Sequence, residues 1–157
     1  MQQFTMRKTL VISLFSTLAL IGLLTNCKKT STPPVSELIA KVWTVSKVEA
    51  NGTTVYTRGG TSNVQDYSNF RLDLSTGNTV KYTEFDKSVF NGQYTLPSDT
   101  QLTLINLNPA PTGTGSNGSG TISYVINSID ESNLKITRTT ASVKTGGTTN
   151  VYTLTSP

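Results

Sequence analysis

Polar and apolar residues alternate along most of the chain beyond residue 43. The pattern is clearest in three stretches, at 70–74, 90–96 and 134–138. A period of two is that of a β-strand with one face buried and the other in water. The pattern therefore predicts a β-protein in which each strand contributes one face to a common core.

Turn-forming pairs such as Asn51-Gly52 and Gly146-Gly147 separate these stretches, as expected for successive hairpins. Apolar residues at helical spacing over 35–42 predict a helical turn or two before the first strand. No later run could supply the crossover helices of a parallel sheet, so the sheet is expected to be antiparallel. The expected strands are 42–50, 53–58, 69–75, 79–86, 89–96, 101–107, 121–129, 133–143 and 148–155.

Eight or nine antiparallel strands must close or stack, because open edges invite aggregation. Two architectures satisfy this requirement: an up-and-down barrel of about eight strands and a Greek-key β-sandwich. The alternation by itself leaves both open. The segment 109–120 is rich in Pro, Gly and Ser, which predicts a long connection between two strands.

The N-terminal region has a different pattern. A short basic segment at 6–9 precedes an apolar stretch at 10–24, and Cys27 follows. This order is typical of a secretory signal peptide, and the apolar stretch is shorter than the roughly 20 residues that a membrane-spanning helix needs. We therefore expect residues 1–26 to be a cleaved signal peptide.

The sequence Leu-Thr-Asn-Cys at 24–27 resembles the bacterial lipobox, whose cysteine becomes the lipid-modified N-terminus of the mature protein. The lipobox prefers Gly, Ala or Ser where this chain has Asn26, a departure that bears on the efficiency of processing. Cys27 is the predicted site of lipid attachment, and several acyl chains on one residue anchor a protein stably. Residues 27–34 are then a flexible tether, and residues 35–157 are the folded domain.

The composition argues against several classes of function. The chain has no histidine, which is the commonest general acid or base and metal ligand, and it has one cysteine rather than a disulfide framework. Removing Arg7 and Lys8 from the 13 basic residues leaves 11 against 9 acidic ones, a net charge of +2, and no basic stripe appears. No nucleophile elbow, phosphate loop, Cys/His cluster or dinucleotide fingerprint occurs. We expect no enzymatic activity, no metal or other cofactor, and no nucleic-acid partner.

From about residue 37 to residue 155, the layout resembles the lipocalin-like lipoproteins of Bacteroidetes-type bacteria. Where lipocalins carry Gly-x-Trp at the start of the first strand, this chain has Lys41-Val42-Trp43. The resemblance implies an up-and-down barrel that holds a small molecule inside. It rests on the segments 38–49, 70–78, 92–96, 101–104, 124–126, 134–136 and 151–154.

The lipobox and the resemblance together imply a cell-envelope address, as a lipoprotein of the outer membrane. The surface-export signal associated with this bacterial group is acidic, whereas Cys27 is followed by Lys28 and Lys29. The basic pair favours the periplasmic face over the cell surface. It would also attract anionic lipid head groups.

The resemblance also implies roles for single residues. Trp43 would plug the closed end of the barrel, where an arginine of a late strand stacks on it; Arg138 is the candidate, because it shares a strand face with Leu134 and Ile136. Alternatively, Arg138 clamps a ligand carboxylate or sulfate. The candidate ligand-binding residues are Trp43, Tyr82, Phe85, Tyr94, Tyr124 and Arg138, of which the aromatic ones suit an ordinary β core equally well.

Three hypotheses follow for function. The first is a membrane-tethered, monomeric barrel that binds a small apolar or amphipathic ligand. The second is a non-enzymatic envelope protein that docks a partner protein. The third is a hydrolase that uses Glu84 and Asp86, which alternate along one predicted strand and would lie roughly 7 Å apart on one face. For this pair, exposed charges with no catalytic role are the simpler interpretation.

Overall fold

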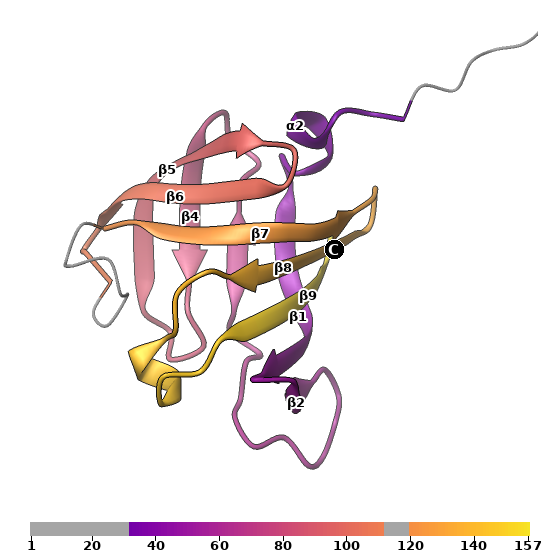
Figure 1. Ribbon diagram of the computed structural model, residues 1–157, viewed down its shortest axis with the longest axis vertical. Helices are drawn as coiled ribbons and strands as arrows, with labels where there is room; N and C mark the ends of the chain where they lie inside the picture. The colour runs from indigo at the N-terminus through magenta and orange to yellow at the C-terminus, as the bar shows by residue number, and fades with distance from the viewer. Residues whose placement is uncertain (1–31, 112–119) are drawn as a thin grey trace, which may run out of the picture. The chain divides into compact units, whose positions relative to one another are not determined.

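The computed structural model describes residues 32–111 and 120–157 (Figure 1). Pro33–Pro157 forms one compact unit, and every residue of the hydrophobic core lies within it. This unit therefore carries the complete barrel and its core. The predicted signal peptide, Cys27 and most of the predicted tether lie outside the described residues.

Nine strands follow one short helix, α2 (Val35–Leu38), and their positions agree closely with the predicted ones. The largest difference is at 133–143, where the strand ends five residues early and a 3₁₀ helix, η1 (Val143–Thr145), follows. The strands are β1 (Val42–Ala50), β2 (Thr53–Thr57), β3 (Arg71–Asp73), β4 (Thr79–Thr83), β5 (Val89–Ser98), β6 (Gln101–Asn108), β7 (Ile122–Ile129), β8 (Asn133–Arg138) and β9 (Asn150–Thr155). Among the described residues, no helix is long and apolar enough to cross a membrane.

The sheet closes on itself. Strands β3 to β9 pair in sequence order, each antiparallel to the next, and β1 pairs with β3 on one edge and with β9 on the other. Eight strands thus form an antiparallel up-and-down barrel, which is the lipocalin-like architecture, and β2 is an extra strand beside the second half of β1. Closure satisfies the backbone hydrogen bonds that an open sheet would leave exposed. The sandwich alternative is excluded.

Short hairpins can connect these strands because aspartate side chains in the turns accept hydrogen bonds from nearby backbone N–H groups. In the turn between β7 and β8, Oδ1 of Asp130 accepts hydrogen bonds from the backbone N–H groups of Ser132 and Asn133, both at 2.8 Å. Asp86 does the same for Ser88 between β4 and β5, at 3.0 Å. Such Asx turns reverse the chain without tertiary contacts.

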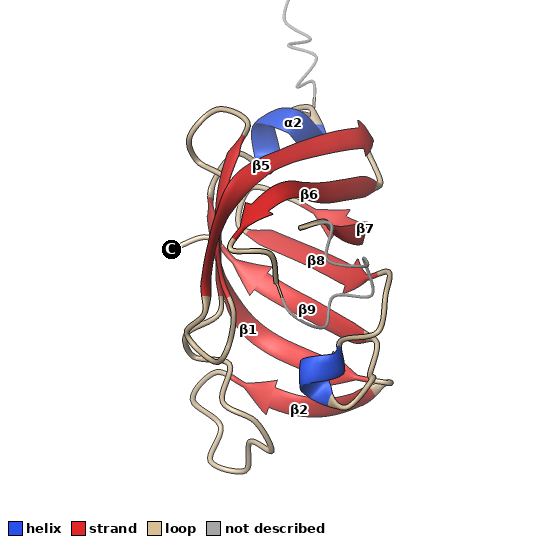
Figure 2. Cartoon of the chain, turned by 90° about the vertical axis from the view of Figure 1, so that its left-hand side faces the viewer, coloured by secondary structure: helices blue, strands red, loops and turns tan. Residues whose placement is uncertain are grey.

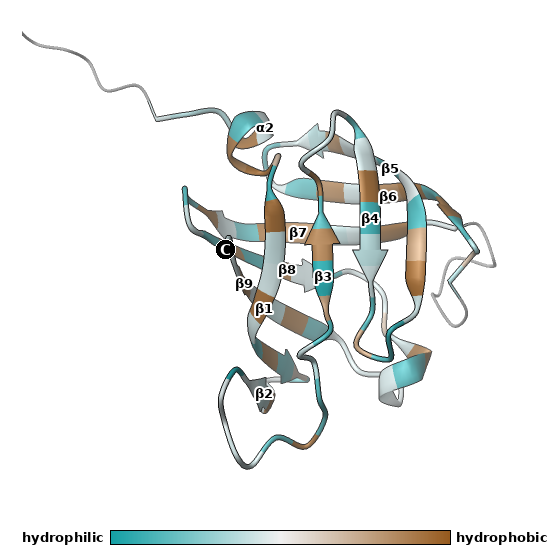
Figure 3. Ribbon diagram, turned by 180° about the vertical axis from the view of Figure 1, so that it is seen from behind, coloured by the Kyte–Doolittle hydropathy of each residue, from teal (hydrophilic) through white to brown (hydrophobic). Residues whose placement is uncertain are grey.

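The core lies inside the barrel, and hydrophobic and hydrophilic residues alternate along its strands (Figure 3). Trp43 is fully buried at the end covered by α2, where its indole N–H donates to the carbonyl oxygen of Ile39 at 2.9 Å. The 3₁₀ helix η1 lies at the opposite end (Figure 2). We call these the α2 end and the η1 end.

The strand registers assign each connection to an end. The segment 58–70, the β4–β5 turn at 84–88 and the segment 139–149 all lie at the η1 end, because 58–70 leads into β3, which runs away from this end, while β4 and β8 run toward it. Side chains from these three connections meet over the barrel interior there. This end is consequently where polar groups enter the otherwise apolar core.

Candidate functional site

Arg138, the last residue of β8, points into the barrel interior near the η1 end. It is 2 % exposed and lies directly opposite Tyr124 of β7. Its Nε has no hydrogen-bond partner among the described residues. The guanidinium hydrogen-bonds to Tyr152, but a buried donor without a partner is costly, so its Nε requires an explanation.

Four buried tyrosines surround the guanidinium and form what we call the tyrosine cluster: Tyr67, Tyr82, Tyr124 and Tyr152. Tyr152 is central, with its ring centroid 6.2 Å from that of Tyr67 and 6.3 Å from that of Tyr124. Phe70 stacks on Tyr152 at 4.7 Å and packs edge-on against Tyr82 at 5.6 Å. The rings bring several hydroxyl groups together in one part of the apolar core.

Two of these hydroxyls, those of Tyr67 and Tyr124, also lack a hydrogen-bond partner among the described residues. The Tyr152 hydroxyl accepts a hydrogen bond from Nδ2 of Asn150 at 3.2 Å. Buried side-chain oxygens and nitrogens in native proteins nearly always have a partner. Three unpartnered atoms within one cluster therefore distinguish this region from the rest of the core.

Glu84 is the second charged residue in the interior, with a side chain that is 4 % exposed. Its carboxylate accepts hydrogen bonds from the Tyr82 hydroxyl at 3.3 Å and from the ammonium of Lys144. Lys144, on η1, also binds Oδ2 of Asp86 at 2.8 Å and lies over the ring of Phe90 at 5.6 Å. Lys144 thereby fastens η1 to the β4–β5 turn.

The electrostatics of the site follow from burial. Burial raises the pKa of each member of the tyrosine cluster, so the hydroxyls are neutral and protonated at pH 7. Burial alone would lower the pKa of Arg138, but the surrounding tyrosines and Glu84 outweigh it, and the pKa of Arg138 is raised. The guanidinium is consequently charged, and the hydroxyls next to it can donate.

Lys144 and Asp86 stabilise each other's charged forms. Desolvation would lower the pKa of Lys144, but hydrogen bonds to Asp86 and Glu84 reverse this, and its pKa is raised. Desolvation would raise the pKa of Asp86, but hydrogen bonds from Lys144 and Ser88 reverse this too, and its pKa is lowered. Both groups are ionised at neutral pH.

The structure brings together four of the six predicted ligand-binding residues. Tyr82, Tyr124 and Arg138 belong to the cluster just described, and Phe85 contacts it through Tyr67, with ring centroids 5.1 Å apart. The other two lie toward the α2 end. Trp43 is there beneath α2, and Tyr94 lines a surface groove beside Ser36 of that helix.

The prediction that Arg138 stacks on Trp43 is wrong. Trp43 precedes Thr44, which pairs with Thr155 of β9, whereas Arg138 follows Thr137, which pairs with Val151. The two side chains therefore lie toward opposite ends of the barrel. Arg138 does face inward, but it is the last residue of β8, and β8 runs from the α2 end toward the η1 end.

Several residues of the site were not predicted. Tyr152 could have been found, since it alternates with Asn150 and Leu154 on the closing strand and all three are buried. Tyr67 lies in the irregular segment before β3 and Lys144 in η1, so no periodicity indicates that either reaches the interior. Glu84 was expected to be an exposed charge; it is buried because it continues the inward-facing alternation of Val80 and Tyr82, and Lys144 binds its carboxylate.

The hydrolase hypothesis receives no support from this arrangement. A glycosidase needs one carboxyl group free to give up a proton and one free to act as base or nucleophile. Here Lys144 binds both Glu84 and Asp86. Within 32–111 and 120–157, no group of three or more His, Cys, Asp or Glu side chains could hold a metal ion.

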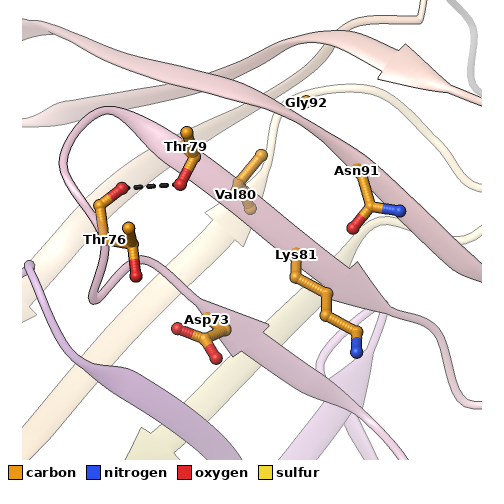
Figure 4. Close-up of a pocket in the computed structure, with 7 residues that line it drawn as sticks. All are labelled: Asp73, Thr76, Thr79, Val80, Lys81, Asn91 and Gly92. Atoms are coloured by element: carbon orange, nitrogen blue, oxygen red, sulfur yellow. Dashed lines mark hydrogen bonds between the residues drawn. The ribbon is translucent and has the colours of Figure 1, made fainter.

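A shallow groove of about 370 Å³ lies on the outside of the barrel, over β3, β4 and β5 (Figure 4). Thr76 and Thr79 line one part of it, and Asp73 and Lys81 line another. Two of its polar groups already have local partners: the Thr79 hydroxyl donates to the carbonyl oxygen of Thr76, and Asp73 accepts from Ser75. The groove offers no buried unpartnered group, in contrast to the interior site.

Comparison with known proteins gives structural likeness only. No family model matches the sequence, and no curated protein matches it. A lipocalin-like protein from Bacteroides uniformis superposes with a TM-score of 0.49 at 13% identity, over 76% of this chain and 99% of that one. An uncharacterized protein from Bacteroides eggerthii superposes with a TM-score of 0.46 at 12% identity, over 74% of this chain and 98% of that one.

Proposed function

We propose that this chain is a membrane-tethered lipoprotein whose barrel binds one small apolar or amphipathic molecule near the η1 end. One observation carries the proposal: Tyr67, Tyr124 and Arg138 each bury a polar atom without a partner, among packed aromatic rings. Ligand sites in proteins are mostly apolar with a few convergent polar groups, which is the composition found here. An eight-stranded barrel has room for at most one small ligand.

The two halves of the barrel differ in what fills them. Toward the α2 end, the interior is occupied by the chain's own apolar side chains, among them Trp43, Leu72 and Leu154, all at most 1 % exposed. Toward the η1 end, hydroxyl groups and a guanidinium take their place. A ligand would therefore enter from the η1 end, past the segments 58–70 and 139–149, and rest its apolar part against the aromatic rings.

Tethering is proposed from the sequence. A diacylated Cys27 would hold the barrel at the outer membrane, with the periplasmic face favoured by Lys28 and Lys29. Metabolic labelling with a radioactive fatty acid tests it: the native protein should incorporate label, and a Cys27→Ser variant should not. An unlabelled native protein would remove the membrane address and leave the barrel's ligand a separate question.

Native mass spectrometry tests ligand binding. The protein purified from its own cells under non-denaturing conditions should show a second species, heavier by the mass of one small molecule, that disappears on denaturation. Calorimetric titration with two amphiphiles of equal chain length, laurate and dodecanol, would then measure affinity. A barrel that carries no adduct and binds neither probe contradicts the proposal.

A further inference from the structure

We propose that the polar end of the ligand is an oxyanion, a carboxylate or a sulfate, held by Arg138 together with the hydroxyls of Tyr124 and Tyr67. This inference rests on the proposed function and adds the chemical class of the head group. It predicts that the barrel distinguishes an anionic amphiphile from a neutral one of the same length.

The unpartnered atoms are all able to donate. Arg138 Nε carries a hydrogen and cannot accept, and the two tyrosine hydroxyls are protonated because burial raises their pKa. Three donors near one fixed positive charge match a group that only accepts hydrogen bonds and carries negative charge. A neutral alcohol would satisfy part of this set but would leave the guanidinium unneutralised.

The buried carboxylate of Glu84 is hydrogen-bonded to residues other than Arg138. Glu84 attracts Arg138 through space, but its two oxygens are bound by Tyr82 and Lys144. Asp86 is also bound by Lys144 and is partly exposed to water. Among the described residues, the internal acids therefore form ion pairs with Lys144, and the guanidinium of Arg138 has no carboxylate in hydrogen-bond contact.

The geometry places the head group at a definite position. Arg138 and Tyr124 are direct cross-strand partners, so their side chains emerge side by side from β8 and β7 into the interior. Tyr67 approaches from the segment before β3, and Tyr152 lies between the two tyrosines. The anion would be held between the β7–β8 wall and Tyr67, with its apolar part against Phe70 and Phe85, which pack on the same cluster.

Calorimetric titration of Pro33–Pro157 with laurate and with dodecanol, below their aggregation concentrations, tests the inference. The unsubstituted barrel should bind laurate at least about tenfold more tightly, which corresponds to one charge-assisted hydrogen bond. Arg138→Gln should remove that preference while dodecanol still binds with unchanged affinity. Tyr124→Phe, which keeps the ring, should reduce the preference by about threefold to tenfold.

Arg71→Gln is the matched control, because Arg71 is an exposed arginine of β3, facing away from the core. It should leave both affinities unchanged. Since Arg138→Gln could prevent folding, Arg138→Lys serves as a second variant that retains the charge and is expected to keep part of the preference. Equal affinity for laurate and dodecanol in the unsubstituted barrel, or full laurate preference in folded Arg138→Gln, would overturn the anion inference alone. Failure of the barrel to bind either probe would overturn the proposed function with it.

Discussion

Lys144 forms an ion pair with Glu84, and 60 residues of sequence separate the two. The Glu84 side chain is almost completely buried, whereas Lys144 approaches it from η1 with a side chain that is 19 % exposed. The pair thus attaches the segment 139–149 to the barrel wall beside the tyrosine cluster. It also explains how a carboxylate can remain inside the core.

Replacing Lys144 by Met should destabilise the barrel, because it leaves the Glu84 carboxylate buried without its cation. We expect the free energy of unfolding to fall by about 2 to 4 kcal/mol, measured by urea denaturation. Lys81→Met, at an exposed position of β4, should change it by no more than about 0.5 kcal/mol. The double variant Glu84→Gln/Lys144→Met should recover part of the loss, and a double variant less stable than Lys144→Met would refute this account.

Arg58 should be important for holding the extra strand β2 on the barrel. Its Nε donates to the carbonyl oxygen of Val45 at 2.9 Å, and its Nη2 donates to the hydroxyl of Thr44 at 2.8 Å. Val45 lies at the irregularity where the β1–β9 register shifts. Arg58→Met should lower the unfolding free energy by about 1 to 2 kcal/mol in the same urea assay. Arg71→Met, at an exposed arginine of β3, is the control. If Arg58→Met lowers the unfolding free energy no more than Arg71→Met does, the hydrogen bonds of Arg58 contribute little.

Gly92 should not tolerate a side chain. A Cβ at this position would lie 2.6 Å from the carbonyl oxygen of Ile105, a backbone atom of the neighbouring strand β6. The β5–β6 register shifts between Asn91 and Gln93, so the strands approach closely around Gly92. Gly92→Ala should cost about 1 to 3 kcal/mol, measured by thermal unfolding, whereas Thr95→Ala, at an exposed site on the same strand, should be nearly neutral.

Stability should fall as the pH rises above about 10. Burial raises the pKa of the tyrosine cluster above its ordinary value of 10.0, so the folded chain retains protons there that the unfolded chain loses. The raised pKa of Lys144 acts in the same direction. A state that binds more protons loses stability as protons become scarce, so the melting temperature should begin to drop near pH 10 and keep dropping as the pH rises toward the raised native pKa values.

The absorbance of tyrosinate provides the matching measurement. The cluster tyrosines should ionise together with unfolding rather than before it, because their hydroxyls are buried in the native barrel. Ionisation of these tyrosines near pH 10 in a barrel that circular dichroism shows to be still folded would contradict the assigned burial.

Local sequence patterns predicted the barrel well because strands and hairpins depend on neighbouring residues. The alternation at 70–74, 90–96 and 134–138 marks which side chains face inward, and each Asx turn reverses the chain without distant contacts. Arg138 was placed on an inward face for this reason, and it is buried.

The sequence by itself thus determined the strands, their inward faces and an antiparallel connectivity, together with an N-terminal export signal that stays a prediction. Only the tertiary structure decided which ends of the strands meet, and so which polar groups lie together inside the barrel. The registers of β1 and β8 against β9 separate Trp43 from Arg138, and the irregular segments bring Tyr67 and Lys144 to the η1 end. Such contacts depend on register and closure between residues far apart in sequence, where no local periodicity reports the partner.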